Sequence, residues 1–207
     1  MKVIIIGAGS TAMTVADIIS ESHNFSLSGF VGTPEEADKL RRSKVYNNVQ
    51  FLGDHSLLPK LKEDGINGFI AAIGDNQIRE EVFYKALNAG LHPVNAISNK
   101  AIIDSSVSIG RGIVISPGVV LSHGVILEDN IIIDPSVIVD VNTYVASNCY
   151  FYPGCIVCGG SRIEKNVTFG AGSIVEPGIE IGKNNNIVAG TVVRENMERH
   201  YRKESNL

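Results

Sequence analysis

The chain has 207 residues, enough for two small domains, and 44% of them are hydrophobic. Its formal net charge of −4 and isoelectric point near 5.7 argue against nucleic acid as the main partner. No run of 18 apolar residues occurs, so we expect no membrane span. The apolar run at the N-terminus is too short for a signal peptide, so we expect a cytoplasmic protein.

The first hundred residues have the pattern of a Rossmann-like α/β domain. An apolar run at residues 2–6 ends in a glycine turn, an amphipathic stretch covers residues 11–22, and a second apolar run follows at 27–32. This order of strand, turn, helix and strand begins a βαβ unit. Further elements are expected in this order: a helix at 57–62, a strand at 68–73, a helix after a turn at 74–76, and a strand at 91–96.

The glycine turn is a candidate anion site. Gly7, Gly9 and Ala12 fit the spacing G-x-G-x-x-A. Backbone N–H groups at the start of a helix attract a phosphate. A plain structural turn, a nucleotide-sugar phosphate site and an NAD site all remain open, and the first two are favoured. Under the nucleotide-sugar interpretation, Gly7, Gly9 and Ser10 bind substrate.

The NAD interpretation lacks one expected residue. A dinucleotide site needs an acidic residue at the end of the second strand, where it binds the ribose. Gly32 and Thr33 occupy that place, and Glu35 and Glu36 follow only after a proline.

A second candidate loop is Gly74-Asp75-Asn76, which follows the buried stretch at 68–73. Asp75 or Asn76 can cap the helix that comes next, or it can hydrogen-bond a nucleotide base. Both interpretations remain open, and we include Gly74, Asp75 and Asn76 among the substrate-binding candidates.

Residues 101–196 divide into sixteen consecutive units of six. The third place is always aliphatic or Phe, and the sixth is always Gly, Asn or Ser. A fixed hexapeptide period is the signature of a parallel β-helix, in which the third side chain points inward and the sixth residue often takes a positive φ. Pro117, Pro135 and Pro153 recur at intervals of 18 residues. Three units therefore make one coil, and the repeat has about five coils.

The three cysteines lie inside this repeat. Cys155 and Cys158 have C-x-x-C spacing, but no second pair or histidine cluster completes a zinc site. We therefore expect no metal, and we interpret Cys149, Cys155 and Cys158 as small residues that fill the β-helix.

Four features together resemble one family. They are the opening VIIIGAGS, the stretch AAIGDNQIREEV at 71–82, the join HPVNAIS at 92–98, and the hexapeptide units. The chain resembles the sugar O- and N-acyltransferases related to sialic-acid O-acetyltransferase and UDP-4-amino-sugar N-acetyltransferase. The resemblance implies a left-handed β-helix and a homotrimer, with acetyl-CoA bound along the helix between neighbouring subunits.

The resemblance also implies a division of the chain. Residues 1–97 would form a nucleotide-sugar-binding α/β domain that takes a nucleotide-linked amino sugar. Residues 98–196 would form the β-helix, and residues 197–207 a C-terminal tail. The family's common ending, Gly-x-Pro-Ala, is absent from this tail.

The family's catalytic residues transfer only in part. Its His–acid pair falls on Val141 and Asn142, and a second histidine near the CoA thioester falls on Tyr150. The glycine whose N–H faces the thioester falls on Gly159 and is kept. The family's acidic pair after the second strand falls on residues 32–33, which are not acidic. Val141, Asn142, Tyr150 and Gly159 are the cofactor-binding candidates.

His123 is the candidate catalytic base. It is the only histidine in the repeat, it occupies the fifth place of its unit, and it precedes Val141 by 18 residues. It should therefore lie one coil, or about 5 Å, from Val141 in the same corner column. Its next residue is Gly124, so an orienting carboxylate must come from elsewhere, and Glu128 and Asp140 are candidates. The alternative is an exposed turn histidine without a catalytic role.

Two functions follow from these observations. The first is acyl-CoA-dependent transfer, with acetyl as the expected group, to an amino or hydroxyl group of a nucleotide-linked sugar in surface polysaccharide or glycan biosynthesis. The alternative is a non-catalytic or altered trimeric protein that binds a nucleotide sugar, or acts in assembly, on the same scaffold. The departures at Val141 and Asn142 favour this alternative, whereas the fold, the domain order and Gly159 favour the transferase, which is the preferred interpretation.

Overall fold

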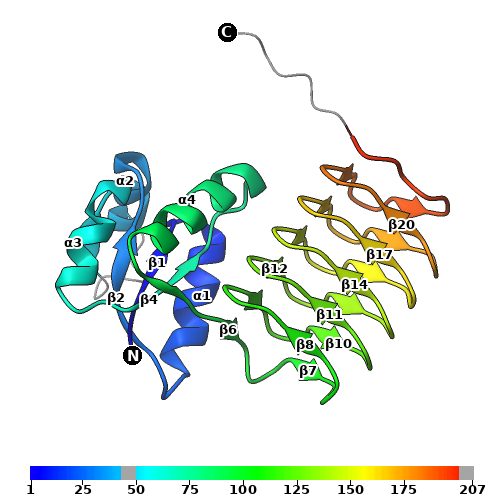
Figure 1. Cartoon of the computed structure of the whole chain (residues 1–207), viewed down its shortest axis with the longest axis horizontal. Coiled ribbons are helices and arrows are strands. Elements are labelled where there is room, and N and C mark those ends of the chain that lie inside the picture. The colour runs from blue at the N-terminus through cyan, green and yellow to red at the C-terminus, as the bar shows by residue number, and fades with distance from the viewer. Residues whose placement is uncertain (43–49, 201–207) are drawn as a thin grey trace, which may run out of the picture. The chain divides into compact units, whose positions relative to one another are not determined.

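The computed structural model describes residues 1–42 and 50–200. The chain forms two compact units. The first contains Met1–Asn99 with Arg111–Val114, and the second contains Lys100–Gly110 and the chain from Ile115 onward. The expected fold class, a Rossmann-like α/β domain followed by a left-handed parallel β-helix, is confirmed (Figure 1).

A parallel five-stranded sheet forms the centre of the first unit. Its strands follow the order β3-β2-β1-β4-β5. Their bounds are Lys2–Ile6 for β1, Ser26–Val31 for β2, Phe51–Gly53 for β3, Gly68–Ala71 for β4 and His92–Pro93 for β5. The helices are α1 (Ser10–Ser20), α2 (Pro34–Arg42), α3 (Leu58–Glu63) and α4 (Asn76–Asn88), with the short 3-10 helix η2 (His55–Leu57) before α3.

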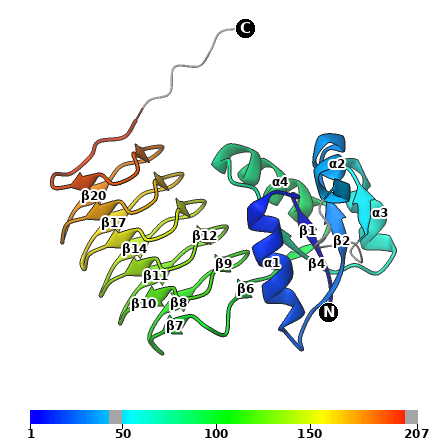
Figure 2. The same ribbon diagram turned by 180° about the vertical axis from the view of Figure 1, so that it is seen from behind.

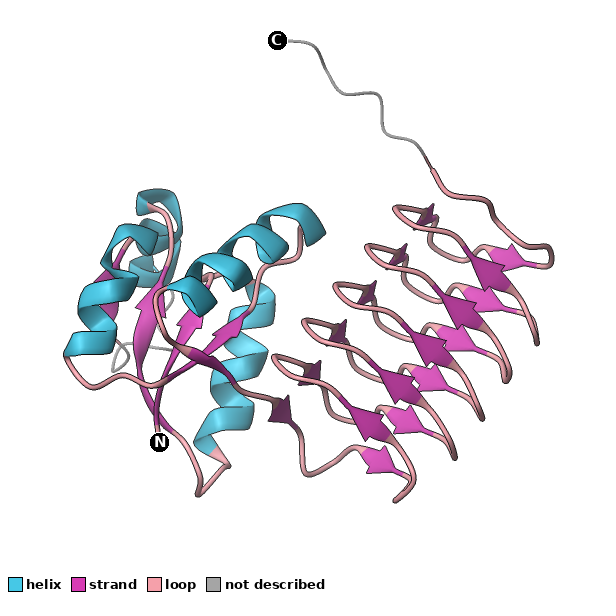
Figure 3. Ribbon diagram, in the orientation of Figure 1, coloured by secondary structure: helices cyan, strands magenta, loops and turns pink. Residues whose placement is uncertain are grey.

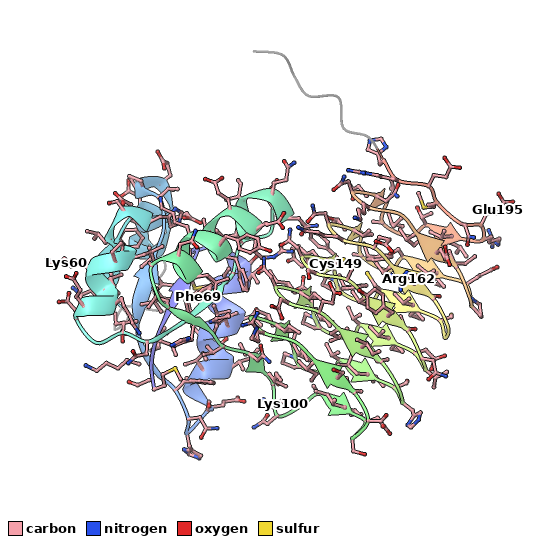
Figure 4. The ribbon with its side chains drawn as sticks, in the orientation of Figure 1. Lys60, Phe69, Lys100, Cys149, Arg162 and Glu195 are labelled. Atoms are coloured by element: carbon pink, nitrogen blue, oxygen red, sulfur yellow. The ribbon has the colours of Figure 1, made fainter. Side chains whose placement is uncertain are left out.

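Helices cover both faces of this sheet, as Figure 2 shows for α1 from behind. Alternate residues of a strand point to opposite faces. Ile4, Ile6 and Phe69 belong to a buried cluster with residues of α3 and α4. Phe69 makes an edge-to-face contact with Phe83 of α4, with ring centroids 5.4 Å apart (Figure 4). On the opposite face, α1 contributes buried apolar side chains such as Val15.

Two elements of this unit were not predicted. One is β3, a strand of only three residues. The other is α2, which begins with a reciprocal capping box: Glu36 N–H donates to Thr33 Oγ1 at 3.3 Å, and Thr33 N–H donates to Glu36 Oε2 at 2.9 Å. The sequence Thr-Pro-Glu-Glu, with Pro34 in the first helical position, carries this signal. The strand expected at 91–96 is divided into β5 and β6 (Ala96–Ile97).

The second unit is a β-helix of two-residue strands joined by regular turns (Figure 3). Pairing joins residues 18 apart, as in Val120 with Ile138 and Ile138 with Ile156, so three units form one coil. One sheet follows the order β22-β19-β16-β13-β10-β7 and a second follows β20-β17-β14-β11-β8. In the third, β21, β18, β15, β12 and β9 follow one another.

The bounds of these strands are, in the first sheet, Ile102–Ile103 (β7), Val120–Leu121 (β10), Ile138–Val139 (β13), Ile156–Val157 (β16), Ile174–Val175 (β19) and Val192–Val193 (β22). In the second they are Ser108–Ile109 (β8), Ile126–Leu127 (β11), Tyr144–Val145 (β14), Arg162–Ile163 (β17) and Glu180–Ile181 (β20). In the third they are Val114–Ile115 (β9), Ile132–Ile133 (β12), Tyr150–Phe151 (β15), Thr168–Phe169 (β18) and Asn186–Ile187 (β21).

The hexapeptide places behave as predicted. Every third-place side chain from Ile115 to Val193 is buried. Every sixth place from Gly112 to Gly190 has a positive φ, including Asn142 at +55°. Glycine adopts this conformation freely and asparagine tolerates it, which explains the choice of residues there. Inside the helix, Phe151 and Phe169 stack with ring centroids 4.6 Å apart.

The cysteines and the chain end complete the second unit. None of the three cysteines forms a disulfide, and Cys149 and Cys155 are buried, as expected for small interior residues. After β22, Met197 forms a parallel bridge with Ile181 of the preceding coil. None of the helices in the described part of the chain has the length and apolar character required of a membrane span.

Candidate active site

His123, Val141 and Gly159 stack in one corner column of the β-helix. Asn142 N–H donates to His123 O at 2.9 Å, and Gly160 N–H donates to Val141 O at 2.9 Å. Each of the three residues therefore lies one coil from the next, as the 18-residue period predicted for His123 and Val141. The corner joins the sheet of β10 and β13 to the sheet of β11 and β14.

The His123 side chain is 72% exposed and is held on one edge only. Its Nδ1 lies 2.9 Å from Ser106 Oγ and 3.4 Å from Asp104 Oδ1. Ser106 Oγ also lies 2.6 Å from Asp104 Oδ1, and Gly124 N–H donates to Ser106 Oγ at 2.9 Å. The other ring nitrogen, Nε2, has no hydrogen-bond partner among residues 1–42 and 50–200.

Asp104 is therefore the carboxylate beside His123. Hydrogen bonds from the Ser106 side chain and backbone lower the pKa of Asp104 below its usual value, and His123 adds to this effect. Sequence reasoning named Glu128 and Asp140 instead. Glu128 accepts hydrogen bonds from Tyr144 and Ser147 at the next corner, and Asp140 lies one coil later, with its Oδ2 beside Gly159. The 18-residue period contained the missing signal. It places Asp104 one coil before Ser122, and Ser122 is the residue that directly precedes His123.

Gly159 has a steric reason to be glycine in this chain. A Cβ there would lie 2.8 Å from Val141 Cγ2 and 3.0 Å from Val141 O. Val141 is apolar and 42% exposed, and Asn142 is also exposed. The N–H groups of Val141 and Gly159 have no acceptor within the described ranges. The corner thus offers two backbone donors in the same column as His123.

Tyr150 lies elsewhere. It belongs to β15, in the sheet with β12 and β18, opposite the corner that carries His123. Its hydroxyl donates to Asp134 Oδ2 at 3.0 Å, and its ring stacks on Tyr152 with centroids 4.4 Å apart. Burial raises the pKa of Asp134, and the hydrogen bond from Tyr150 opposes this shift. One chain alone does not bring Tyr150 to His123.

The N-terminal candidates lie at the carboxyl edge of the first sheet. The glycine turn follows β1 and the loop at 74–76 follows β4. Because β1 pairs with β2 on one side and with β4 on the other, the strand order reverses there, and ligands of open α/β sheets bind at such a point. Gly7 has a φ of +107°, and a Cβ on it would lie 2.7 Å from Ala72 O.

The glycine turn is partly occupied by an internal carboxylate. Ala8 N–H donates to Glu36 Oε1 at 3.2 Å, while the other oxygen of Glu36 caps α2. Gly9 and Ser10 are exposed, and a Cβ on Gly9 would meet nothing within 4 Å. Sequence reasoning dismissed Glu36 because it counted positions after β2 and did not consider that the capping box turns this side chain back toward β1.

The loop after β4 is held by hydrogen bonds to the first residues of α4. The Asp75 carboxylate accepts from Gln77 N–H at 2.8 Å and from Ile78 N–H at 3.0 Å, so it caps α4. Arg79 is fully buried and donates to Ile73 O at 2.9 Å and to Asn76 Oδ1 at 2.6 Å. The capping interpretation of Asp75 therefore describes this structure, and Asn76 is held by Arg79.

A cavity of about 300 Å³ lies beside this edge, at the ends of β2 and β3. It was not expected from the sequence. Its lining includes Gly32, Pro34, Phe51, Gly53 and Asp54. Hydrogen bonds from Ser56 lower the pKa of Asp54, so this wall of the cavity carries a negative charge at neutral pH. Across the two described ranges, no three His, Cys, Asp or Glu side chains are grouped as a metal ion would require.

Comparisons with known proteins agree with these two units. Residues 2–86 match the PglD N-terminal domain family, and residues 160–195 match the bacterial transferase hexapeptide family of six repeats. The family resemblance inferred from the sequence is confirmed. No curated protein matches the chain by sequence.

Solved structures extend this similarity over nearly the whole chain. PerB from Caulobacter crescentus, in complex with CoA and GDP-perosamine, is 29% identical with a TM-score of 0.88, over 97% of this chain and 92% of that one. A histidine-to-asparagine mutant of perosamine N-acetyltransferase from the same organism, with the same ligands, is 28% identical with a TM-score of 0.88, over 96% and 91%. The acetyltransferase domain of PglB from Neisseria gonorrhoeae, in complex with acetyl coenzyme A, shares the fold at 23% identity and a TM-score of 0.82, over 95% and 92%.

Proposed function

We propose that this protein transfers an acetyl group from acetyl-CoA to an amino or hydroxyl group of a nucleotide-linked sugar, in surface polysaccharide or glycan biosynthesis. The similarity to PerB supports this proposal, because it covers both units and PerB is solved with CoA and GDP-perosamine. Acetyl-CoA and nucleotide sugars are made in the cytoplasm, so a cytoplasmic location goes with this function.

The observation that carries the proposal is the corner column of His123. His123 Nε2 accepts the proton of the acceptor amine or hydroxyl while the acceptor atom bonds to the thioester carbonyl carbon. The C–S bond then breaks, and CoA leaves as a thiolate that takes up the proton. A general base at this step contributes on the order of 10²- to 10⁴-fold in rate.

Backbone donors in the same column would stabilise the charge that develops on the carbonyl oxygen. Val141 N–H lies one coil from His123, and Gly159 N–H lies two coils away. One coil corresponds to about 5 Å. In this proposal Val141 and Gly159 contribute their N–H groups and Asn142 lines the same corner, so all three act as CoA-site residues.

A domain of residues 1–97 would bind the nucleotide-linked sugar. Gly7, Gly9 and Ser10 lie at the start of α1, where N–H groups and the helix dipole favour a diphosphate. The loop of residues 74–76 borders the same strand-order reversal. The cavity beside β2 and β3 has a suitable size for part of a nucleotide.

A homotrimer is part of the proposal. The first residue of each strand in the sheet β7 to β22 points outward, and all six are aliphatic: Ile102, Val120, Ile138, Ile156, Ile174 and Val192. Ile102 is 67% exposed, and the others are half-buried. A continuous aliphatic row on a flat face suits association with identical copies. In a trimer, Tyr150 of one copy and His123 of another could border a shared site.

A second candidate is a nucleotide-sugar-binding or assembly protein without turnover. The exposed Val141 favours it, because an aliphatic side chain stands where the family has its catalytic histidine. Substrate turnover distinguishes the two functions, whereas binding of a nucleotide sugar does not.

The test measures CoA formation with acetyl-CoA and a panel of UDP-, GDP- and dTDP-linked amino sugars, using wild type, His123→Ala and the control His200→Ala. His200 is exposed and lies near the end of the described chain. We expect turnover by wild type and by the control, and a loss of about 10²- to 10⁴-fold in His123→Ala. Calorimetric binding of a nucleotide sugar without any turnover of acetyl-CoA would support the binding protein instead.

A further inference from the structure

We infer that Ser106 and Asp104, from the coil that precedes His123, fix the His123 ring in the tautomer that leaves Nε2 free to accept a proton. The inference rests on the proposed function, in which His123 is the general base. It adds two positioning residues, which act through His123 and do not contact the reacting atoms. Neither residue follows His123 in sequence, where the family has its acid.

The donors and acceptors around the Ser106 hydroxyl determine this tautomer. A serine hydroxyl has one proton to donate and two lone pairs that accept. Gly124 N–H can only donate, so it occupies one lone pair at 2.9 Å. An ionised carboxylate can only accept, so the single hydroxyl proton goes to Asp104 Oδ1 at 2.6 Å.

One lone pair of Ser106 Oγ then remains for His123 Nδ1, at 2.9 Å. Nδ1 must therefore be the donor and carry the hydrogen. In a neutral imidazole the other nitrogen is then an acceptor, and here that nitrogen is Nε2. The lowered pKa of Asp104 supports its ionised form at neutral pH, on which the accounting depends.

The same carboxylate also serves the protonated ring. When Nε2 takes a proton, the imidazolium charge lies next to Asp104, whose Oδ1 is 3.4 Å from Nδ1. Opposite charges at this distance attract, although exposure to water weakens the effect. Gly124 completes the arrangement, because its N–H anchors Ser106 Oγ directly beside the ring.

The tautomer can be read without substrate. We would record long-range ¹H–¹⁵N spectra of protein with ¹⁵N-labelled histidine, at a pH where the ring is neutral, and identify the His123 signals by their loss in His123→Ala. The expected result is a protonated Nδ1 and an unprotonated Nε2. A His123 ring with the proton on Nε2 would overturn the inference.

Two substitutions sharpen this test. Asp104→Ala frees the Ser106 proton to be donated to Nδ1, so we expect the ring proton to move to Nε2. Ser106→Ala removes the acceptor and should give a mixture of tautomers, while Ser106→Thr, which keeps the hydroxyl, should restore the wild-type spectrum. Ser105→Ala is the matched control, because Ser105 is an exposed neighbour in the same turn.

Kinetics separate this inference from the proposed function. Asp104→Ala and Ser106→Ala should lower kcat on the order of 10- to 100-fold at an unchanged KM, as second-layer partners of a histidine do. Failure of the proposed function would appear as full turnover in His123→Ala. Failure of the inference would appear as full turnover in Asp104→Ala together with an unchanged spectrum, while His123→Ala is inactive.

Discussion

The corner at His123 and the corner at Val141 have the same backbone and opposite chemistry. The carbonyl oxygens of His123 and Val141 each accept a hydrogen bond of 2.9 Å from the sixth-place N–H of the next coil. At His123 the column presents an imidazole, a hydroxyl and a carboxylate. One coil later it presents an aliphatic side chain packed over Gly159. The hexapeptide repeat thus determines the position of a fifth-place side chain but does not determine its residue type.

The difference between the third and the fifth place of the hexapeptide explains why the residue type varies at the corner. Third-place residues such as Leu121, Val139 and Val157 fill the interior and have to be apolar. Fifth-place residues lie at the corner and are exposed or half-buried, so a base can stand on another coil where, unlike at Gly159, there is room for a side chain. In the proposed function, His123 accordingly acts one coil before the place where the family resemblance puts the catalytic histidine.

The largest expected change in the free energy of unfolding is at a third-place residue, whose side chain points into the β-helix. Phe151→Ala removes a ring that is fully buried and stacked on Phe169, so we expect a loss of about 3–5 kcal/mol in the free energy of unfolding. Val141→Ala, at an outward place, should change it by less than about 0.5 kcal/mol. Urea denaturation measures both variants, and equal effects would remove the distinction between the two places.

An intermediate effect is expected at Gly159. Gly159→Ala places a Cβ 2.8 Å from Val141 Cγ2, so we expect destabilisation of about 1–3 kcal/mol. The double variant Gly159→Ala/Val141→Ala removes that methyl group and should recover part of the loss, although Val141 O would still lie 3.0 Å away. Thermal unfolding checks both. No recovery in the double variant would mean that the backbone contact alone requires glycine.

The smallest effect concerns Asp134, which directly follows β12 in the third sheet. Burial raises the pKa of Asp134, so its favourable contribution to stability is present at low pH and is lost as pH rises through the folded-state value. Asp134→Asn keeps an acceptor for Tyr150 and removes this charge. We expect higher stability than wild type at neutral pH, with the difference vanishing in acid. An equal difference at every pH would contradict a charge effect.

The sequence predicted the β-helix well because a strict period determines both the inward places and the corners. The 18-residue interval was sufficient to place His123 and Val141 in one column. Ser106 and Asp104 were missed because the search for a carboxylate looked at residues that follow His123, whereas these two precede it by 17 and 19 residues.

Other parts of the site could not be predicted from spacing alone. Tyr150 matches a family position in sequence, yet it lies away from the His123 corner. It follows Val141 of that corner by nine residues, which is half of an 18-residue coil. Glu36 reaches Ala8 through a capping box that a count of positions after β2 does not show. Both depend on where a side chain points in space.

The central claim, that the catalytic base stands one coil before its usual place in the family, is tested most directly by the initial rate of acetyl transfer in two variants. His123→Ala should lose about 10²- to 10⁴-fold. His123→Ala/Val141→His, which moves the imidazole to the next corner, should regain part of that rate. Transfer at the full wild-type rate in His123→Ala would contradict the account.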